Sequence, residues 1–162
     1  MNKFTPDNII IPSGIDTVDF KLRMLTINDV VKDYDAVMSS AEHLTGIFGS
    51  DDVWPVGLTL EQDLVDLGWH QKEFENKSSF AYTVMRLDES QCLGCVYVYP
   101  SEKSDYDAKV ILWVRQSELG AGLDKKLFST VKGWLSEKWW FSSAAYPGRE
   151  MTWQEWESLP NK

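Results

Sequence analysis

The stretch WVRQSELGAGLDKKL, residues 113–127, joins the end of an apolar strand to the start of a helix through a turn of small residues. Exposed backbone N–H groups in such a turn, together with the positive end of a helix, attract an anion. Asp124 nevertheless places a negative charge where the helix begins. The stretch therefore predicts a phosphate-binding loop whose charge is partly reversed.

Hydrophobic patterns on both sides of this stretch predict an α+β fold with one mixed sheet and helices on both faces. The expected order is β-α-α-β-β-β-α-β-α. Strands are expected at 19–25, 79–87, 92–100, 108–115 and 138–146, and helices from Asn28 to near Gly46, after Thr59, from Leu123 and after Thr152. Residues 1–18 are expected to form an N-terminal arm, with NIII as a short edge strand, and residues 19–162 a single domain.

Capping-box pairs mark two of the helix starts, at Thr59 with Gln62 and at Thr152 with Glu155. Apolar residues at helical spacing predict which side of the first two helices is buried. The expected buried residues are Val30, Val31, Tyr34, Val37 and Met38 in the first helix, and Leu60, Leu64, Leu67 and Phe74 in the second.

The composition of the chain limits its partners. Of its 162 residues, 43% are hydrophobic and eight are tryptophan, which is enough for a real core or an aromatic-lined cleft. The net charge of −9 argues against nucleic acid and anionic lipid and favours cationic partners such as amines, although acidity also simply aids solubility. No apolar run of membrane-spanning length and no signal-peptide pattern is found, so a cytoplasmic protein is expected.

The glycine turn between a central strand and a helix, in this order of elements, resembles the GNAT superfamily of acyl-CoA-dependent N-acyltransferases over about residues 19–146. In that family the loop runs Arg/Gln-x-x-Gly-x-Gly/Ala, and its amides hold the coenzyme A pyrophosphate. Here it runs from Leu119 to Asp124, and Gly122 matches while the two ends depart. GNAT proteins usually end in a hairpin of two strands; only TWQEWESLPNK follows the last expected strand, with Trp153 and Trp156 to cover the sheet.

The resemblance implies acetyl-CoA as co-substrate and no metal. It assigns the pantetheine to the main chain of the central strand and the pyrophosphate to the loop and the lysines after it. The residues concerned are Leu112, Trp113 and Val114, then Gly120, Ala121, Gly122 and Leu123, then Lys125 and Lys126. Two alternatives stay open: Asp124 caps the helix with its own carboxylate, and the lysines are merely solvated.

Candidate catalytic residues are few. By position, Tyr146 resembles the tyrosine that follows the fifth strand in GNAT proteins, the alternative being a packing tyrosine. His70 and Glu73 lie three apart on a predicted helix, where they would bind a cationic amine and take its proton, or else form an ordinary surface pair. The His-x-x-Glu spacing also suits a metal, but His43 is the only other histidine, so no metal site is predicted.

Candidate acceptor-binding residues lie on the strands. Tyr97 and Tyr99 share one strand face and, with Trp113, would line an acceptor groove, unless they only pack the core. Asp107, in the turn before the central strand, is a second acidic candidate. The cysteines of CLGC, residues 92–95, are three apart in a strand, so their sulfurs are expected to diverge.

Two hypotheses follow for the function. The first is an N-acetyltransferase that moves an acetyl group from acetyl-CoA directly to a small amine, with no nucleic-acid or membrane partner. The second is a non-catalytic GNAT-fold binding or regulatory module whose coenzyme A site has decayed. A homodimer is left open by both.

Overall fold

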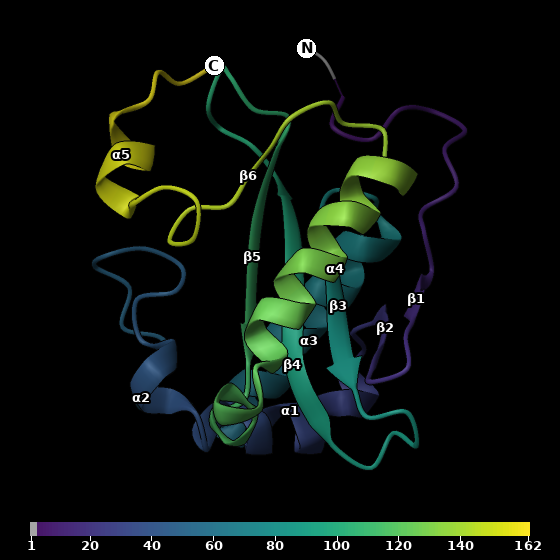
Figure 1. The fold of residues 1–162 in the computed structure, drawn as a ribbon, viewed down its shortest axis with the longest axis vertical. Coiled ribbons are helices and arrows are strands. Elements are labelled where there is room, and N and C mark those ends of the chain that lie inside the picture. Colours follow the sequence, from purple (N-terminus) through teal and green to yellow (C-terminus); the bar gives the residue numbers. More distant parts are fainter. Residues whose placement is uncertain (1–2) are drawn as a thin grey trace.

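A computed structural model describes residues 3–162 as a six-stranded sheet with helices on both faces (Figure 1). The strands are β1 (Gly14–Asp16), β2 (Lys21–Met24), β3 (Phe80–Met85), β4 (Cys92–Pro100), β5 (Ala108–Val114) and β6 (Ala144–Ala145). The α-helices are α1 (Val30–Met38), α2 (Ala41–Leu44), α3 (Leu60–Glu75), α4 (Leu123–Lys138) and α5 (Trp153–Ser158), and the 3-10 helices are η1 (Ile27–Asp29) and η2 (Gln116–Ala121). The predicted α+β class is confirmed.

The strands follow one another across the sheet in chain order, and every neighbouring pair is antiparallel except β5 and β6. These two are parallel and pair only where Ala108 and Lys109 meet Ala144 and Ala145. Beyond Lys109, β5 is paired with β4 on one side only, and within residues 3–162 no strand pairs with its other side. The sheet therefore has an open edge along the second half of β5.

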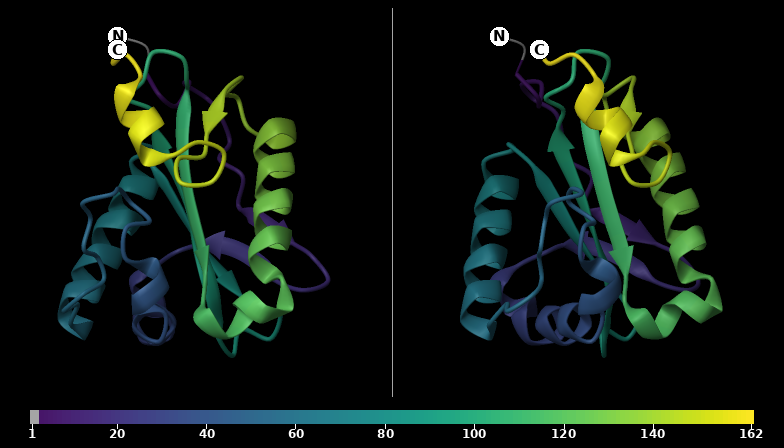
Figure 2. Two further views of the ribbon diagram at one scale, coloured as in Figure 1. Left: turned by 60° about the vertical axis from the view of Figure 1, so that its left-hand side comes forward. Right: turned by 90° about the vertical axis from the view of Figure 1, so that its left-hand side faces the viewer.

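Each face of the sheet carries its own hydrophobic core. Helix α4 covers one face through Leu127 and Val131, and α1 and α3 cover the other through Val37 and Leu67 (Figure 2). Side chains of β4 alternate between the two cores, with Tyr97 on the α1–α3 side. The two-sided burial explains why the central strands are almost wholly apolar.

The predicted buried sides of α1 and α3 are partly wrong. Val31 is 70% exposed, and Leu60 and Leu64 are also exposed. Two carboxylates, Asp33 in α1 and Asp63 in α3, are buried in their place at 3% and 2% exposure. Both helices are therefore turned so that acids, rather than some of their leucines and valines, face the sheet. Hydrophobic burial alone would favour the reverse.

Three element boundaries differ from the sequence prediction. The helix expected from Asn28 to Gly46 divides into η1, α1 and α2, with Ser39 and Ser40 between the last two. The strand expected at 138–146 shrinks to Ala144–Ala145: residue 138 ends α4, and residues 139–143 are irregular and pair with no strand. The edge strand expected at NIII lies instead at Gly14–Asp16, where Gly14 comes so close to the Leu22 carbonyl that a side chain would not fit.

The two cysteines do not diverge as predicted. The β3–β4 register shifts between Val84, which pairs with Gly94, and Met85, which pairs with Cys92, so Leu93 is an extra residue in β4. This bulge turns Cys92 toward the core that also holds Cys95. Both thiols are free and buried, and burial raises the pKa of Cys92 to about 12, so the pair is unreactive packing.

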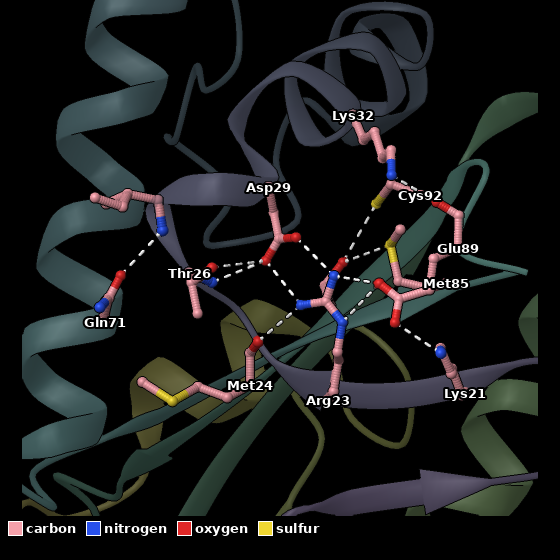
Figure 3. Close-up of polar contacts among 12 residues, drawn as sticks. Lys21, Arg23, Met24, Thr26, Asp29, Lys32, Gln71, Met85, Glu89 and Cys92 are labelled. Carbon is pink, nitrogen blue, oxygen red and sulfur yellow. Dashed lines mark hydrogen bonds and ion pairs between the residues drawn. The ribbon is translucent and has the colours of Figure 1, made fainter. Parts of the chain in front are cut away.

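An ionic network holds the start of α1 against the edge of the sheet (Figure 3). The guanidinium of Arg23 donates to both carboxylate oxygens of Asp29, at 3.0 and 2.7 Å, and to the carboxylate of Glu89 in the β3–β4 turn. Asp29 also accepts from the backbone N–H of Thr26. Hydrogen bonds to Arg23 and then Lys21 lower the pKa of Glu89 to about 2. The network fixes the helix that carries Asp33.

Candidate functional site

A cleft of about 440 Å³ opens along the free edge of β5, and we call it the β5 cleft. Its walls come from β5, from α2 and the loop after it, from the start of α4 and from the turn after β6. The lining residues are His43, Leu44, Thr45, Gly46, Ile47, Ile111, Leu112, Trp113, Val114, Leu119, Asp124, Pro147, Gly148, Arg149 and Trp153. The three predicted pantetheine residues of β5 thus lie together in this cleft, with both ends of the predicted phosphate loop.

Asp124 is neutralised within the cleft. Its carboxylate accepts two hydrogen bonds from the guanidinium of Arg149, at 2.8 and 2.7 Å, in the paired geometry that arginine and carboxylate prefer. Arg149 comes from the turn after β6, so the ion pair joins the two sides of the cleft. The alternative that Asp124 caps α4 is therefore wrong: the N-cap is Gly122, and no side chain caps it.

Side chains also occupy carbonyl groups on the open edge of β5. Arg149 donates to the Leu112 carbonyl at 3.0 Å, and Nε2 of His43 lies 3.0 Å from the Val114 carbonyl. The other ring nitrogen of His43 lies 2.7 Å from the side-chain oxygen of Gln116. A ligand that binds the β5 main chain at these two carbonyls must compete with Arg149 and His43.

The predicted phosphate loop is mostly a 3-10 helix, η2, which ends at Gly122 with φ +75°. That left-handed conformation favours glycine and joins η2 to α4. A methyl group added to the Cα of Gly120 or Gly122 would meet no neighbouring atom, so the surface of the loop is open. Gly120, Ala121 and Gly122 do not line the β5 cleft itself. Buried Leu123 anchors the helix start in the core.

The two lysines at the start of α4 differ in their surroundings. Lys126 pairs with Asp19, before β2, at 3.0 Å, and both side chains are about half exposed. Lys125 is exposed to solvent. Neither lysine lines the β5 cleft. The positive charge that does so comes from Arg149.

A second cavity, of about 240 Å³, lies between α3, β4 and the loop before α3, and we call it the acidic cavity. Its walls are aromatic and acidic. The lining residues are Leu25, Phe48, Asp52, Trp54, Asp63, Asp66, Leu67, His70, Tyr97 and Tyr99. Three residues predicted from the sequence, His70, Tyr97 and Tyr99, thus come together here. The structure adds three carboxylates and Trp54.

Trp113 separates the two spaces. It lines the β5 cleft, and its indole N–H donates to the hydroxyl of Tyr97 in the acidic cavity at 3.1 Å. Its ring centroid is 6.4 Å from that of Trp54, which lines the acidic cavity. Trp113 thus contacts Tyr97 but does not itself line the acidic cavity with Tyr97 and Tyr99, and a shared acceptor groove stays a prediction. A ligand in the cleft and one in the cavity would approach each other at this indole.

The acidic cavity perturbs its titratable groups. Burial lowers the pKa of His70, whose ring lies 5.2 Å from that of Tyr97, so the imidazole is neutral at neutral pH. Burial raises the pKa of Asp63 to about 6 and raises that of Asp66 as well. Asp33 lies behind Asp63 with its carboxyl within hydrogen-bonding reach, and burial holds its pKa well above the ordinary range. The two buried acids therefore share a proton.

The remaining predicted residues lie apart from both spaces. Glu73 accepts a hydrogen bond from the Ser79 hydroxyl at 2.7 Å. The ring of Tyr146 packs on Phe128 of α4, on the opposite face of the sheet from His70, and burial raises the pKa of its hydroxyl to about 12. Asp107 caps the segment before β6 through Ser142 and Ser143.

The residues that sequence reasoning missed include Arg149 and His43 in the cleft, Asp63 in the cavity and Asp33 behind it. The acids carried a usable signal, because Asp33 is three residues after Val30, and Asp63 is four before Leu67, both on apolar helix faces. Arg149 and His43 carried no such signal in the sequence, since each contacts a backbone carbonyl of β5 that is far away in the chain.

Comparisons with solved structures identify the architecture. The ribosomal-protein-S5-alanine acetyltransferase from Vibrio fischeri aligns with 76% of this chain and 67% of its own, at 14% identity and a TM-score of 0.59. The ribosomal L7/L12 α-N-protein acetyltransferase RimL, in complex with coenzyme A, aligns over 80% and 70%, at 16% identity and a TM-score of 0.59. The fold is that of the GNAT acetyltransferases.

A third solved structure, the microcin C7 self-immunity acetyltransferase MccE with acetyl-CoA and AMP, aligns over 79% of this chain and 69% of its own, at 11% identity and a TM-score of 0.60. No protein-family model matches the sequence, and no curated protein does. Within residues 3–162, β6 is followed by α5 and not by a GNAT hairpin, and Trp153 and buried Trp156 pack there.

Two negative observations complete the site. Among the described residues, no three His, Cys, Asp or Glu side chains are grouped so that they could hold a metal ion. In the same part of the chain, no helix has the length and apolar character needed to span a membrane.

Proposed function

We propose that this protein is an N-acetyltransferase that takes acetyl-CoA in the β5 cleft and an amine acceptor in the acidic cavity. The observation that supports it most directly is the meeting of the two spaces at Trp113, on the open edge of a GNAT sheet. One space is the larger of the two, at about 440 Å³, with main-chain groups on its wall. The other is small, aromatic and acidic, which suits an amine.

The residues of the β5 cleft fit acetyl-CoA once Arg149 is taken into account. Ile111 and Trp113 offer apolar walls, and Leu112 and Val114 offer main-chain groups. Arg149, already at the cleft wall, is the cation suited to a pyrophosphate, in place of the arginine or glutamine that Leu119 has replaced. Asp124 opposes this, because its carboxylate holds the same guanidinium.

The chain's own residues can supply the chemistry of acetyl transfer. Bound acetyl-CoA would supply the acetyl group as a thioester, whose C–S bond breaks as the amine nitrogen forms the amide bond and the amine proton passes to the thiolate. His70 is neutral and lies beside Tyr97, so it is suited to take a proton from the acceptor amine. Trp113 and Tyr97 would hold the amine at the junction. The role predicted for Tyr146 as acid stays a prediction.

The first experiment is a calorimetric titration with acetyl-CoA at low and physiological salt. We expect saturable binding, tightened by Asp124→Gly, which frees Arg149, and weakened about tenfold by Arg149→Ala, which leaves Asp124 unpaired beside the phosphates. Lys132→Ala, which removes a surface cation outside the cleft, is the matched control. Identical affinities in all four proteins would remove this cleft from consideration.

Turnover is tested separately with a panel of amines. His70→Ala should lower turnover while leaving the affinity for acetyl-CoA unchanged, because His70 lies in the acidic cavity and not in the cleft. Glu73→Gln, which the structure places on the Ser79 hydroxyl, should change turnover little. If turnover is unchanged in His70→Ala, a group other than His70 must take the proton from the amine.

A second candidate function is favoured by one observation. The bond from Arg149 to the Leu112 carbonyl and its pair with Asp124 occupy a cation and a main-chain acceptor that acetyl-CoA would use. A non-catalytic binding module with a decayed coenzyme A site would keep these contacts. It predicts no heat with acetyl-CoA in the wild type, and binding only after Asp124 is replaced.

A further inference from the structure

The acidic cavity holds more negative charge than the protein neutralises. Asp52, Asp63 and Asp66 line it, and among the described residues its only basic lining group is His70, which burial keeps neutral. In the β5 cleft, by contrast, Asp124 has Arg149 as its counter-ion. The cavity therefore presents a site for a positive charge that the chain itself does not supply.

Asp63 is the acid best placed to receive that charge. It is 2% exposed and lines the cavity, and within residues 3–162 its carboxylate is bonded to no basic group and only shares a proton with Asp33. Asp52 is already engaged, because its carboxylate accepts the backbone N–H of Trp54 at 2.7 Å. A buried carboxylate that no basic group neutralises is costly unless a ligand supplies the positive charge.

The walls suit an ammonium group rather than a metal ion. Tyr97 and Tyr99 stack with ring centroids 6.1 Å apart, and Phe48 lies edge-on to Trp54 at 5.1 Å. Aromatic faces attract organic cations while excluding the water that a small metal ion retains. The group expected here is an alkylammonium, hydrogen-bonded to Asp63.

We propose that the acidic cavity binds the charged end of an alkyl diamine, with Asp63 as its counter-ion and Asp33 as the partner that keeps the shared proton. Only one part of this proposal rests on the proposed function, namely that the bound diamine is the acceptor of the acetyl group. The amine that reacts must be uncharged, whereas the group on Asp63 must be charged, so one amine cannot do both. A second amine resolves this, with its reactive end toward Trp113.

Several groups face the pair of acids, and they determine how pH acts. From α3 come Asp66 and His70, from η1 comes Asp29, and from β4 come Cys92, Cys95 and Tyr97. Asp29 is neutralised by Arg23, and the thiols and the phenol have raised pKa values and stay uncharged near neutral pH. The changes that matter below neutral pH are protonation of Asp63, Asp66 and His70, and each weakens cation binding.

The test is calorimetric titration without acetyl-CoA, with 1,4-diaminobutane, n-butylamine and 1-butanol as probes. We expect both amines to bind and the alcohol not to. Asp63→Asn should weaken amine binding about tenfold or more, because the counter-ion is lost. Asp33→Asn should retain it within about threefold, because the amide still donates a hydrogen bond to Asp63 as the protonated acid does.

The pH profile separates recognition from a merely structural role. Wild-type affinity should fall as pH drops through about 6, the pKa of Asp63, and Asp33→Asn should leave that loss near the same pH, because the amide donates to Asp63 as the protonated acid does. Equal binding of butanol, undiminished binding in Asp63→Asn, or no amine binding at millimolar concentration would each overturn the proposal. Amine binding without acetyl transfer would contradict the proposed acetyltransferase function but not the amine site. Acetyl transfer that is unchanged in Asp63→Asn would contradict only the proposed amine site.

Discussion

In the β5 cleft, the carboxylate of Asp124 and the guanidinium of Arg149 meet at 2.7 Å on a partly exposed surface. In the acidic cavity, a few side chains away across Trp113, Asp33 and Asp63 are almost fully buried with only a shared proton between them. The first charge is balanced within the protein, whereas the shared proton neutralises only one of the two buried acids. A ligand in the cleft would have to displace an internal counter-ion, whereas the acids that line the acidic cavity have no basic counter-ion among the described residues.

Replacing the wall between the two spaces should have the largest effect. Trp113 is 2% exposed, so Trp113→Ala should destabilise the protein by about 3 to 5 kcal/mol through lost contacts and a new void. It would also merge the cleft with the cavity. Urea denaturation measures the change. Trp113→Phe, which keeps a ring but loses the bond to Tyr97, should cost clearly less, and equal costs would mean that the indole N–H is the main contribution.

The raised pKa of Asp63 should make the stability of the protein depend on pH. The pKa of Asp63 in the fold, about 6, is above the ordinary 3.8, so its stabilising contribution is complete below about pH 4 and is lost as pH rises through 6. The free energy of unfolding of the wild type, measured relative to that of Asp63→Asn, should therefore fall by about 3 kcal/mol between about pH 4 and about pH 6. Thermal melts of both proteins from pH 4 to 8 measure the difference. Parallel curves would mean that Asp63 titrates normally.

The ion pair in the cleft should contribute least to stability. Both side chains are partly exposed, so Arg149→Ala and Asp124→Ala should each cost less than about 1 kcal/mol, with a small coupling that salt removes. A double-mutant cycle in urea, with and without added salt, measures this. A coupling well above that value would show that the pair is structural, and the comparison with the acidic cavity would fail.

Sequence reasoning located much of the candidate site but not its charges. Three residues named from the sequence, His70, Tyr97 and Tyr99, line the acidic cavity, and a fourth, Trp113, donates a hydrogen bond to Tyr97 from the wall of the β5 cleft. Glu73, which shares a helix with His70, turns to Ser79 instead. Periodicity gives the side of an element on which a residue lies, but not what the neighbouring element brings to it.

Local sequence patterns were sufficient to predict the α+β class, the central strands, the glycine turn before α4 and two capping boxes, all confirmed in the structure. These features depend on contacts between residues close together in the chain, which local patterns encode.

The charges of the two spaces, in contrast, were set by tertiary contacts alone. The fold brings Arg149 across the β5 edge to Asp124 and Leu112, and it turns α1 and α3 so that Asp33 and Asp63 face inward. The physical reason is that a buried charge is tolerated or not according to partners that arrive from distant segments, and no local pattern specifies those partners.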